Sequence, residues 1–172
     1  MRFSLRLPQR QARLAALAVA YHLARPGAEL DHDTMREYEH GLAEVPHALD
    51  PQLDAEAATL EIGPLQVALL ASALSSVVNE LKTYSMLDAT AAGHRPRSAA
   101  PSFDDTLRSL FPEIAADPPA ASDLAGEAAI LRRQLPLARA RELLEEADAR
   151  RERRTAHEKR RACKKAWQFW KR

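Results

Sequence analysis

The sequence predicts a mostly α-helical protein, with a helical N-terminal domain that holds a minor two-stranded β element and a long, basic, amphipathic C-terminal helix. Three observations support this class. Apolar residues recur at helical spacing along most of the chain. Aromatic residues make up only 5% of it, and abundant Ala favours thin, helix-on-helix cores. Positive charge is concentrated at the C-terminal end.

The first element is predicted to be a short strand that leads directly into a helix. Residues 2–7 alternate apolar and polar side chains, as a half-buried strand does. Pro8 suits the first turn of a helix, and the apolar residues from Leu14 to Tyr21 then recur at 3.6-residue spacing. The sequence Arg25-Pro26-Gly27 ends this helix.

A second helix is expected to begin near Asp31 or Asp33, which are good N-cap residues, and to run to about Ala43. We expect Pro46 and Pro51 to break the helical pattern after it.

A second strand and the main core helix are expected next. Residues 59–62 form the strand, and a helix over 65–86 follows Gly63-Pro64. This helix is the most apolar segment of the chain, and its predicted buried stripe consists of Val67, Leu70, Leu74, Val77, Val78 and Leu81.

The two strand–helix units resemble each other. Residues 5–8 and the helix after them match residues 60–64 and the next helix, about 55 residues further on. A duplicated unit would let the two strands pair and both helices cover one face of the sheet. The match is short, so a chance similarity between Ala/Leu-rich helices is the alternative.

A linker is expected to divide the chain into a strand–helix core domain (1–90), a linker (91–101) and a helical C-terminal region (102–172). In the last region a short helix runs from Asp104 or Asp105 to Phe111, and Pro112 closes it. Pro118-Pro119 is another break.

A final helix, capped by Ser122 or Asp123, is predicted to continue to the C-terminus with a kink at Pro136. Ile130, Leu137 and Leu144 repeat every seven residues in it, with Ala140 and Ala147 between them. We expect this short seam to dock on its own domain rather than to dimerise.

The net charge of +1 hides a strong asymmetry. Residues 150–172 hold eleven Lys or Arg and two Glu, a net charge of +9, so the other 149 residues carry −8. Residues 29–61 form an acidic belt with ten Asp or Glu against Arg36 alone. An Arg-rich composition also arises in GC-rich bacterial genomes, which is the alternative explanation for any Arg cluster here.

On a helical wheel, residues 150–172 separate into two faces. The cationic face is the predicted nucleic-acid-binding site, formed by Arg150, Arg153, Arg154, Arg160, Arg161, Lys164, Lys165, Lys171 and Arg172. The opposite face carries the residues predicted to anchor the helix or to stack on bases, which are Trp167, Phe169 and Trp170. Cations this close in a helix repel one another, so something negative should neutralise them.

Three partners fit such a helix. The leading expectation is a non-enzymatic protein that contacts the nucleic-acid backbone with little sequence specificity. The chief alternative is a structural or assembly protein whose arm docks on an acidic protein surface, including the 29–61 belt of another copy. Intramolecular docking would only close the fold. A second alternative is peripheral binding to an anionic membrane.

No catalytic motif stands out, and we expect no enzyme activity and no cofactor. Glu37/His40 and Glu44/His47 share a Glu-x-x-His spacing that di-iron bundles use, with Glu80 as one further ligand, but solvated helix-surface residues are the preferred interpretation. His32 between two Asp fits a polar cap. Cys163 has no placed partner for catalysis.

One Cys excludes an internal disulfide. The chain has no run of 18 consecutive apolar residues, so no membrane span is predicted. The short apolar stretch 14–20 is a poor secretory signal. A cytoplasmic protein is therefore expected.

Overall fold

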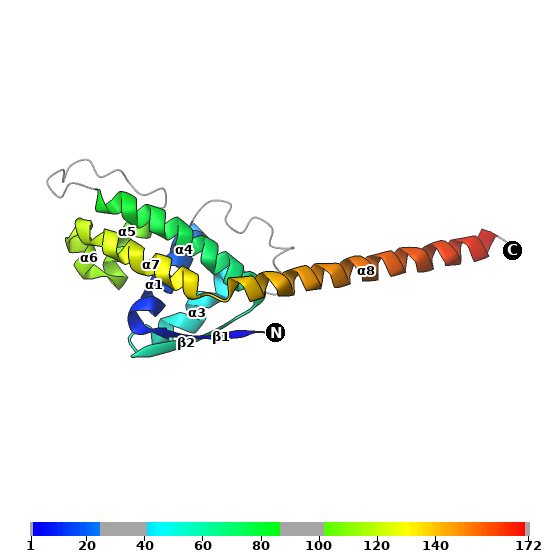
Figure 1. Cartoon of the computed structure of the whole chain (residues 1–172), viewed down its shortest axis with the longest axis horizontal. Helices are drawn as coiled ribbons and strands as arrows, with labels where there is room; N and C mark the ends of the chain where they lie inside the picture. Colours follow the sequence, from blue (N-terminus) through cyan, green and yellow to red (C-terminus); the bar gives the residue numbers. More distant parts are fainter. Residues whose placement is uncertain (1, 25–40, 87–101, 171–172) are drawn as a thin grey trace.

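The computed structural model describes residues 2–24, 41–86 and 102–170, with side chains over 103–158 in the last range. The fold is mostly α with one two-stranded antiparallel sheet, as the sequence predicts. The helices form a compact body, and one long helix extends away from it (Figure 1). The predicted helix over 31–43 and the predicted linker lie largely outside the described residues.

The sheet consists of β1 (Phe3–Pro8) and β2 (Ala57–Ile62). Its register pairs Leu5 with Leu60, the two residues that the internal resemblance puts in equivalent positions. A two-fold arrangement of two related units would give this register. The duplication itself stays an interpretation, and the sheet packs chiefly on α1 and α3 rather than on both predicted helices.

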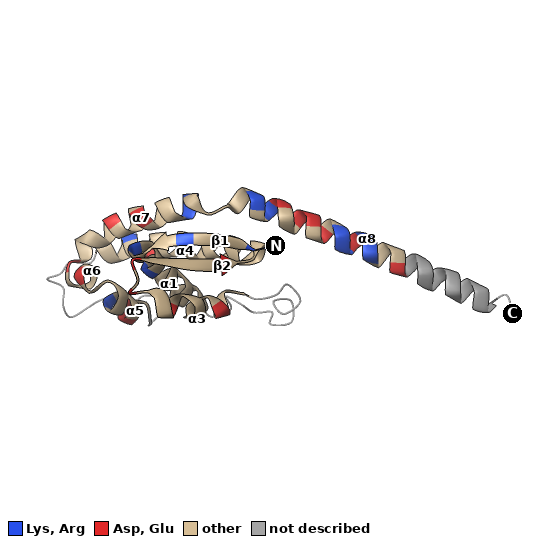
Figure 2. Cartoon of the chain, turned by 90° about the horizontal axis from the view of Figure 1, so that it is seen from below, with Lys and Arg blue, Asp and Glu red and all other residues tan. Residues whose placement is uncertain are grey.

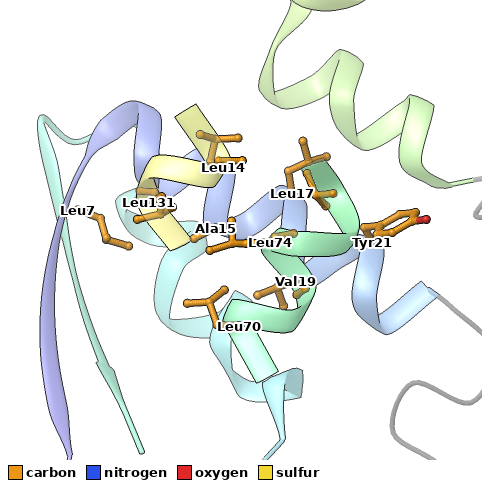
Figure 3. Packing of buried hydrophobic residues seen from close by; sticks show 14 of the residues in the cluster. Leu7, Leu14, Ala15, Leu17, Val19, Tyr21, Leu70, Leu74 and Leu131 are labelled. Atoms are coloured by element: carbon orange, nitrogen blue, oxygen red, sulfur yellow. The ribbon is translucent and has the colours of Figure 1, made fainter. Parts of the chain in front are cut away.

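Helices α1 (Gln9–Ala24) and α4 (Pro64–Ser85) form the centre of the body. Leu14, Leu17 and Leu74 are fully buried where the two helices meet (Figure 3). Five residues of the predicted stripe of α4 are buried and Val78 is half-buried, so the expected core helix is confirmed.

A buried Gln66 fixes the start of α4. Its side-chain oxygen accepts a hydrogen bond from the N–H of Gly63 at 2.9 Å, and its amide nitrogen donates to the carbonyl of Gly41 at 3.1 Å. Because both polar ends of this amide have partners, its burial costs little. Pro64 at the first helical position needs no partner for a missing N–H.

Three prolines start short helices. Pro46 lies in the first turn of α3 (Val45–Leu49), after the 3₁₀ turn η1 (Leu42–Glu44). Pro51 lies in the 3₁₀ turn η2 (Asp50–Gln52). Pro112 begins α6 (Pro112–Ala116), directly after α5 (Ser102–Leu110). The prediction that Pro112 closes the preceding helix is confirmed, because α5 ends at Leu110. The sequence did not predict that each of these prolines also lies in the first turn of a new short helix, where the missing N–H is not used.

The C-terminal region contributes to the same core. Phe103, Leu107 and Leu124 belong to one buried cluster with α1 and α4. After the 3₁₀ turn η3 (Pro118–Ala120), α7 (Ala121–Gln134) lies along α4. Its N-cap is Ala120, without a side-chain cap, so capping by Ser122 or Asp123 was wrong. The predicted domain boundaries remain a prediction.

Candidate functional site

The predicted final helix is two helices. Leu135 has extended backbone angles (φ −64°, ψ 140°), as a residue before proline tends to have, and α8 (Leu137–Trp170) begins after Pro136. The seven-residue seam is therefore broken, and Ile130 of α7 is 51% exposed. The expectation of one kinked helix with a continuous seam was wrong at this point.

Over the part of α8 whose side chains are described, the residues packed on the core lie at its start. Leu137 packs against the core and Ala140 is fully buried, and the helix contacts α4. The 34 residues of α8 span about 50 Å at 1.5 Å per residue. Most of this length extends beyond the body (Figure 1).

The described cations of the predicted site are exposed on the projecting helix. Arg150, Arg153 and Arg154 are all exposed. Arg150 donates to Glu146 at 3.0 Å in an i,i+4 pair on the same helix. Over the described residues, no ion pair is found for Arg153 or Arg154. Such exposed pairs contribute at most about 1 kcal/mol, so Arg150 remains available to another partner.

The rest of the predicted site lies where side chains are not described. Arg160, Arg161, Lys164 and Lys165 belong to the helical backbone of α8, as do Trp167, Phe169 and Trp170. Lys171 and Arg172 lie outside the described residues altogether. The members of the set from Arg150 to Trp170 therefore belong to one continuous helix. The same helix also carries a second charged segment.

An acidic segment comes directly before the basic one, and the sequence interpretation missed it. Glu142, Glu145, Glu146 and Asp148 follow one another with no cation between them, and all four are exposed. Figure 2 shows a group of acidic positions, coloured red, near the body end of α8. These four residues were counted in the net charge of −8 for the 149 residues outside the basic arm, so they did not stand out. The net charge summed over a short window along the sequence would have revealed them.

The acidic segment has local cation partners on the same helix. Arg139 donates to Glu142 at 2.8 Å. This hydrogen bond raises the pKa of Arg139 above its ordinary value, with smaller electrostatic contributions from Glu142 and Glu146.

The structure describes residues 41–61 of the acidic belt. This stretch of sequence contains five Asp or Glu and no Lys or Arg. Asp50, Asp54, Glu56 and Glu61 are exposed, as is Glu44. Asp54 accepts a hydrogen bond from Arg13 of α1 at 3.0 Å. The body therefore presents an acidic surface around the short helices and β2.

The Glu-x-x-His candidates are only partly described. Glu37 and His40 lie outside the described residues, as does His32. Glu44 and His47 are exposed, while Glu80 accepts a hydrogen bond from the Tyr21 hydroxyl at 3.0 Å. Among the described residues, no group of three or more His, Cys, Asp or Glu could hold a metal ion. The side chain of Cys163 lies outside the description.

Of the described helices, α4 alone has the length and mean hydropathy of a membrane span. It lies between α1 and α7, and 44% of its most apolar window is buried inside the body. Core helices of globular proteins share this composition.

Comparison of the chain with protein-family models, curated proteins and solved structures finds no match. What the protein can bind therefore follows from the charge and exposure of α8 and of the surfaces around it.

Proposed function

We propose that this is a non-enzymatic binding protein whose basic arm, residues 150–172, contacts the nucleic-acid backbone with little sequence specificity. The observation that supports the proposal is the separation of charge from the body. Eleven cations lie on a segment whose helical part begins where α8 has already left the core, with Arg150, Arg153 and Arg154 exposed to solvent.

The physical basis is release of counterions. Each phosphate neutralised by a Lys or Arg frees condensed cations, and the gain does not depend on the base sequence. The part of α8 from residue 150 to residue 170 extends for about 32 Å, which is about nine base pairs of duplex. A helix also fits the major groove, whose width is about 12 Å. The aromatic residues at the end suit stacking on unpaired bases.

The test is the salt dependence of binding to labelled duplex DNA and single-stranded RNA, measured by fluorescence anisotropy. For the full chain we expect a log–log slope of about −0.9 per neutralised duplex phosphate and about −0.7 per single-strand phosphate. Replacing Arg150, Arg153 and Arg154 by Ala should make the duplex slope less steep, by up to about 3.

A truncation after Ala149 should remove nearly all of this affinity. Its matched control is the double variant Arg132→Ala/Arg133→Ala, which removes two exposed cations from α7 and should leave the slope unchanged. Thermal unfolding by circular dichroism checks that the truncated body remains folded. Unchanged nucleic-acid affinity after truncation would refute the proposal.

The acidic surface of residues 41–61 favours a second candidate function, in which the arm of one copy docks on this belt of another and builds an assembly. Exposed Asp50, Glu56 and Glu61 offer complementary charge. Reversing Asp50 and Glu61 to Lys should then abolish any self-association seen by sedimentation without nucleic acid. The nucleic-acid proposal expects no effect of this variant on size.

A further inference from the structure

Helix α8 carries two charged blocks of opposite sign and equal length. We call residues 142–148, with four carboxylates and no cation, the acidic block. Residues 159–165, with five Lys or Arg and no carboxylate, form the basic block. Both lie within the single helix Leu137–Trp170. Their centres, 145 and 162, are seventeen residues apart, or about 26 Å along the axis.

This arrangement is complementary to itself when the direction of the helix is reversed. A second α8 laid antiparallel, with its midpoint opposite residues 153–154, puts each acidic block beside the basic block of the other copy. A parallel pair would instead put five cations beside five cations. Like charges at neighbouring helix positions destabilise the pair, so charge selects the antiparallel orientation.

The helix also has a face on which a partner can pack. Leu144, Ala147 and Arg151 follow one another at helical spacing and are partly buried, whereas the residues between them are exposed. Ala140, one turn earlier on this face, is buried against the body, whereas the later positions lie on the projecting part (Figure 1). Small residues such as Ala let helix axes approach to about 8 Å.

We infer that α8 is a self-association element, which pairs antiparallel with the α8 of a second copy through its acidic and basic blocks. The pair is isologous: both copies use the same surface, and the contact between an acidic and a basic block occurs twice. The inference goes beyond the proposed function and does not require it. Arg150 and Arg153 lie outside both blocks, Arg153 on the opposite side of the helix from this packing face and Arg150 at its edge, so phosphate contacts by these two residues remain compatible with pairing.

The first test is sedimentation equilibrium of the nucleic-acid-free full chain at low salt. One variant reverses the acidic block (Glu142→Lys, Glu145→Lys, Glu146→Lys, Asp148→Lys), and a second reverses the basic block (Lys159→Glu, Arg160→Glu, Lys164→Glu, Lys165→Glu). We expect each to raise the dimer dissociation constant by about tenfold or more. The variant that carries both sets reverses four charges in each block, and its dissociation constant should return close to the wild-type value.

The second test uses Cys163, the only Cys in the chain, as the site of a spin label. Position 163 lies about nine residues from the midpoint of the antiparallel pair, so the two labels should be about 30 Å apart. A parallel pair would bring them within about 15 Å, close to the interaxial distance. Pulsed electron paramagnetic resonance measures this separation.

A monomer at all accessible concentrations, a dimer unaffected by either reversal, or a short label distance would each overturn the inference. Loss of the dimer when Asp50 and Glu61 are reversed would also overturn it, in favour of docking on the body. Reversal of the acidic block separates this proposal from the nucleic-acid one. It should weaken the dimer by the factor given above while strengthening phosphate binding, because it adds cations to α8 next to the arm.

Discussion

At the scale of single residues, Arg10 of α1 contacts three other side chains of the body. Its guanidinium donates to Glu127 of α7 at 2.7 Å and to Glu113 of α6 at 3.2 Å. It also lies over the ring of Phe111, 5.6 Å from the centroid. The hydrogen bond to Glu127 raises the pKa of Arg10 above its ordinary value, against the lowering effect of partial burial. Arg10 therefore connects the first helix to elements more than 100 residues later.

Replacing Arg10 by Ala should lower the free energy of unfolding by about 1 kcal/mol, measured by urea denaturation. The side chain is 46% exposed, so each ion pair is screened and contributes well under about 1 kcal/mol. The contact with Phe111 adds about 0.5 kcal/mol. Arg108→Ala, which removes only a long pair to Asp105 on the same helix, is the control and should change stability by less than about 0.5 kcal/mol. Equal effects of the two variants would contradict the connecting role of Arg10.

At the scale of elements, the break between α7 and α8 sets the direction of the arm. Helix α4 contacts both helices, so α7 and the start of α8 dock on the same element on either side of the bend. Leu135 is buried at this bend, and the carbonyl of Pro136 accepts the N–H of Ala140 at 3.0 Å. The bend therefore has support from tertiary packing as well as from proline.

Pro136→Ala should lower the free energy of unfolding by about 0.4–1 kcal/mol, because the unfolded chain gains conformational freedom. We expect no increase in helical circular dichroism, since docking on α4 maintains the bend. Pro64→Ala at the start of α4 is the matched control, because Pro64 also occupies a first helical turn but follows a strand rather than another helix. Higher helicity and stability in Pro136→Ala alone would show that proline imposes the break.

At the scale of the whole molecule, the protein combines a compact body with a projecting rod. A compact chain of 172 residues has a radius of gyration of about 16 Å. Small-angle scattering of the full chain should give a clearly larger value. The truncation after Ala149 should bring the radius much closer to that of a compact protein. A radius near 16 Å for the full chain would mean that α8 folds back on the body.

Local patterns in the sequence were enough to predict both strands, α1 and α4. Alternation and 3.6-residue periodicity identify an element and its apolar face without knowledge of its neighbours. The stripe from Val67 to Leu81 is an example, since only Val78 is less than fully buried. The concentration of cations at the C-terminal end also follows from the sequence alone.

The tertiary structure decided which neighbour covers each face, because this depends on contacts between distant residues. Ile130 fits the predicted seam but is exposed, whereas Ala140 on the next helix is buried. The same packing on α4 ends one helix at Gln134 and starts another at Leu137. The sequence alone determines that the C-terminal arm is basic. The described cations of the arm are exposed to solvent because α8 projects away from the body, which only the tertiary structure shows.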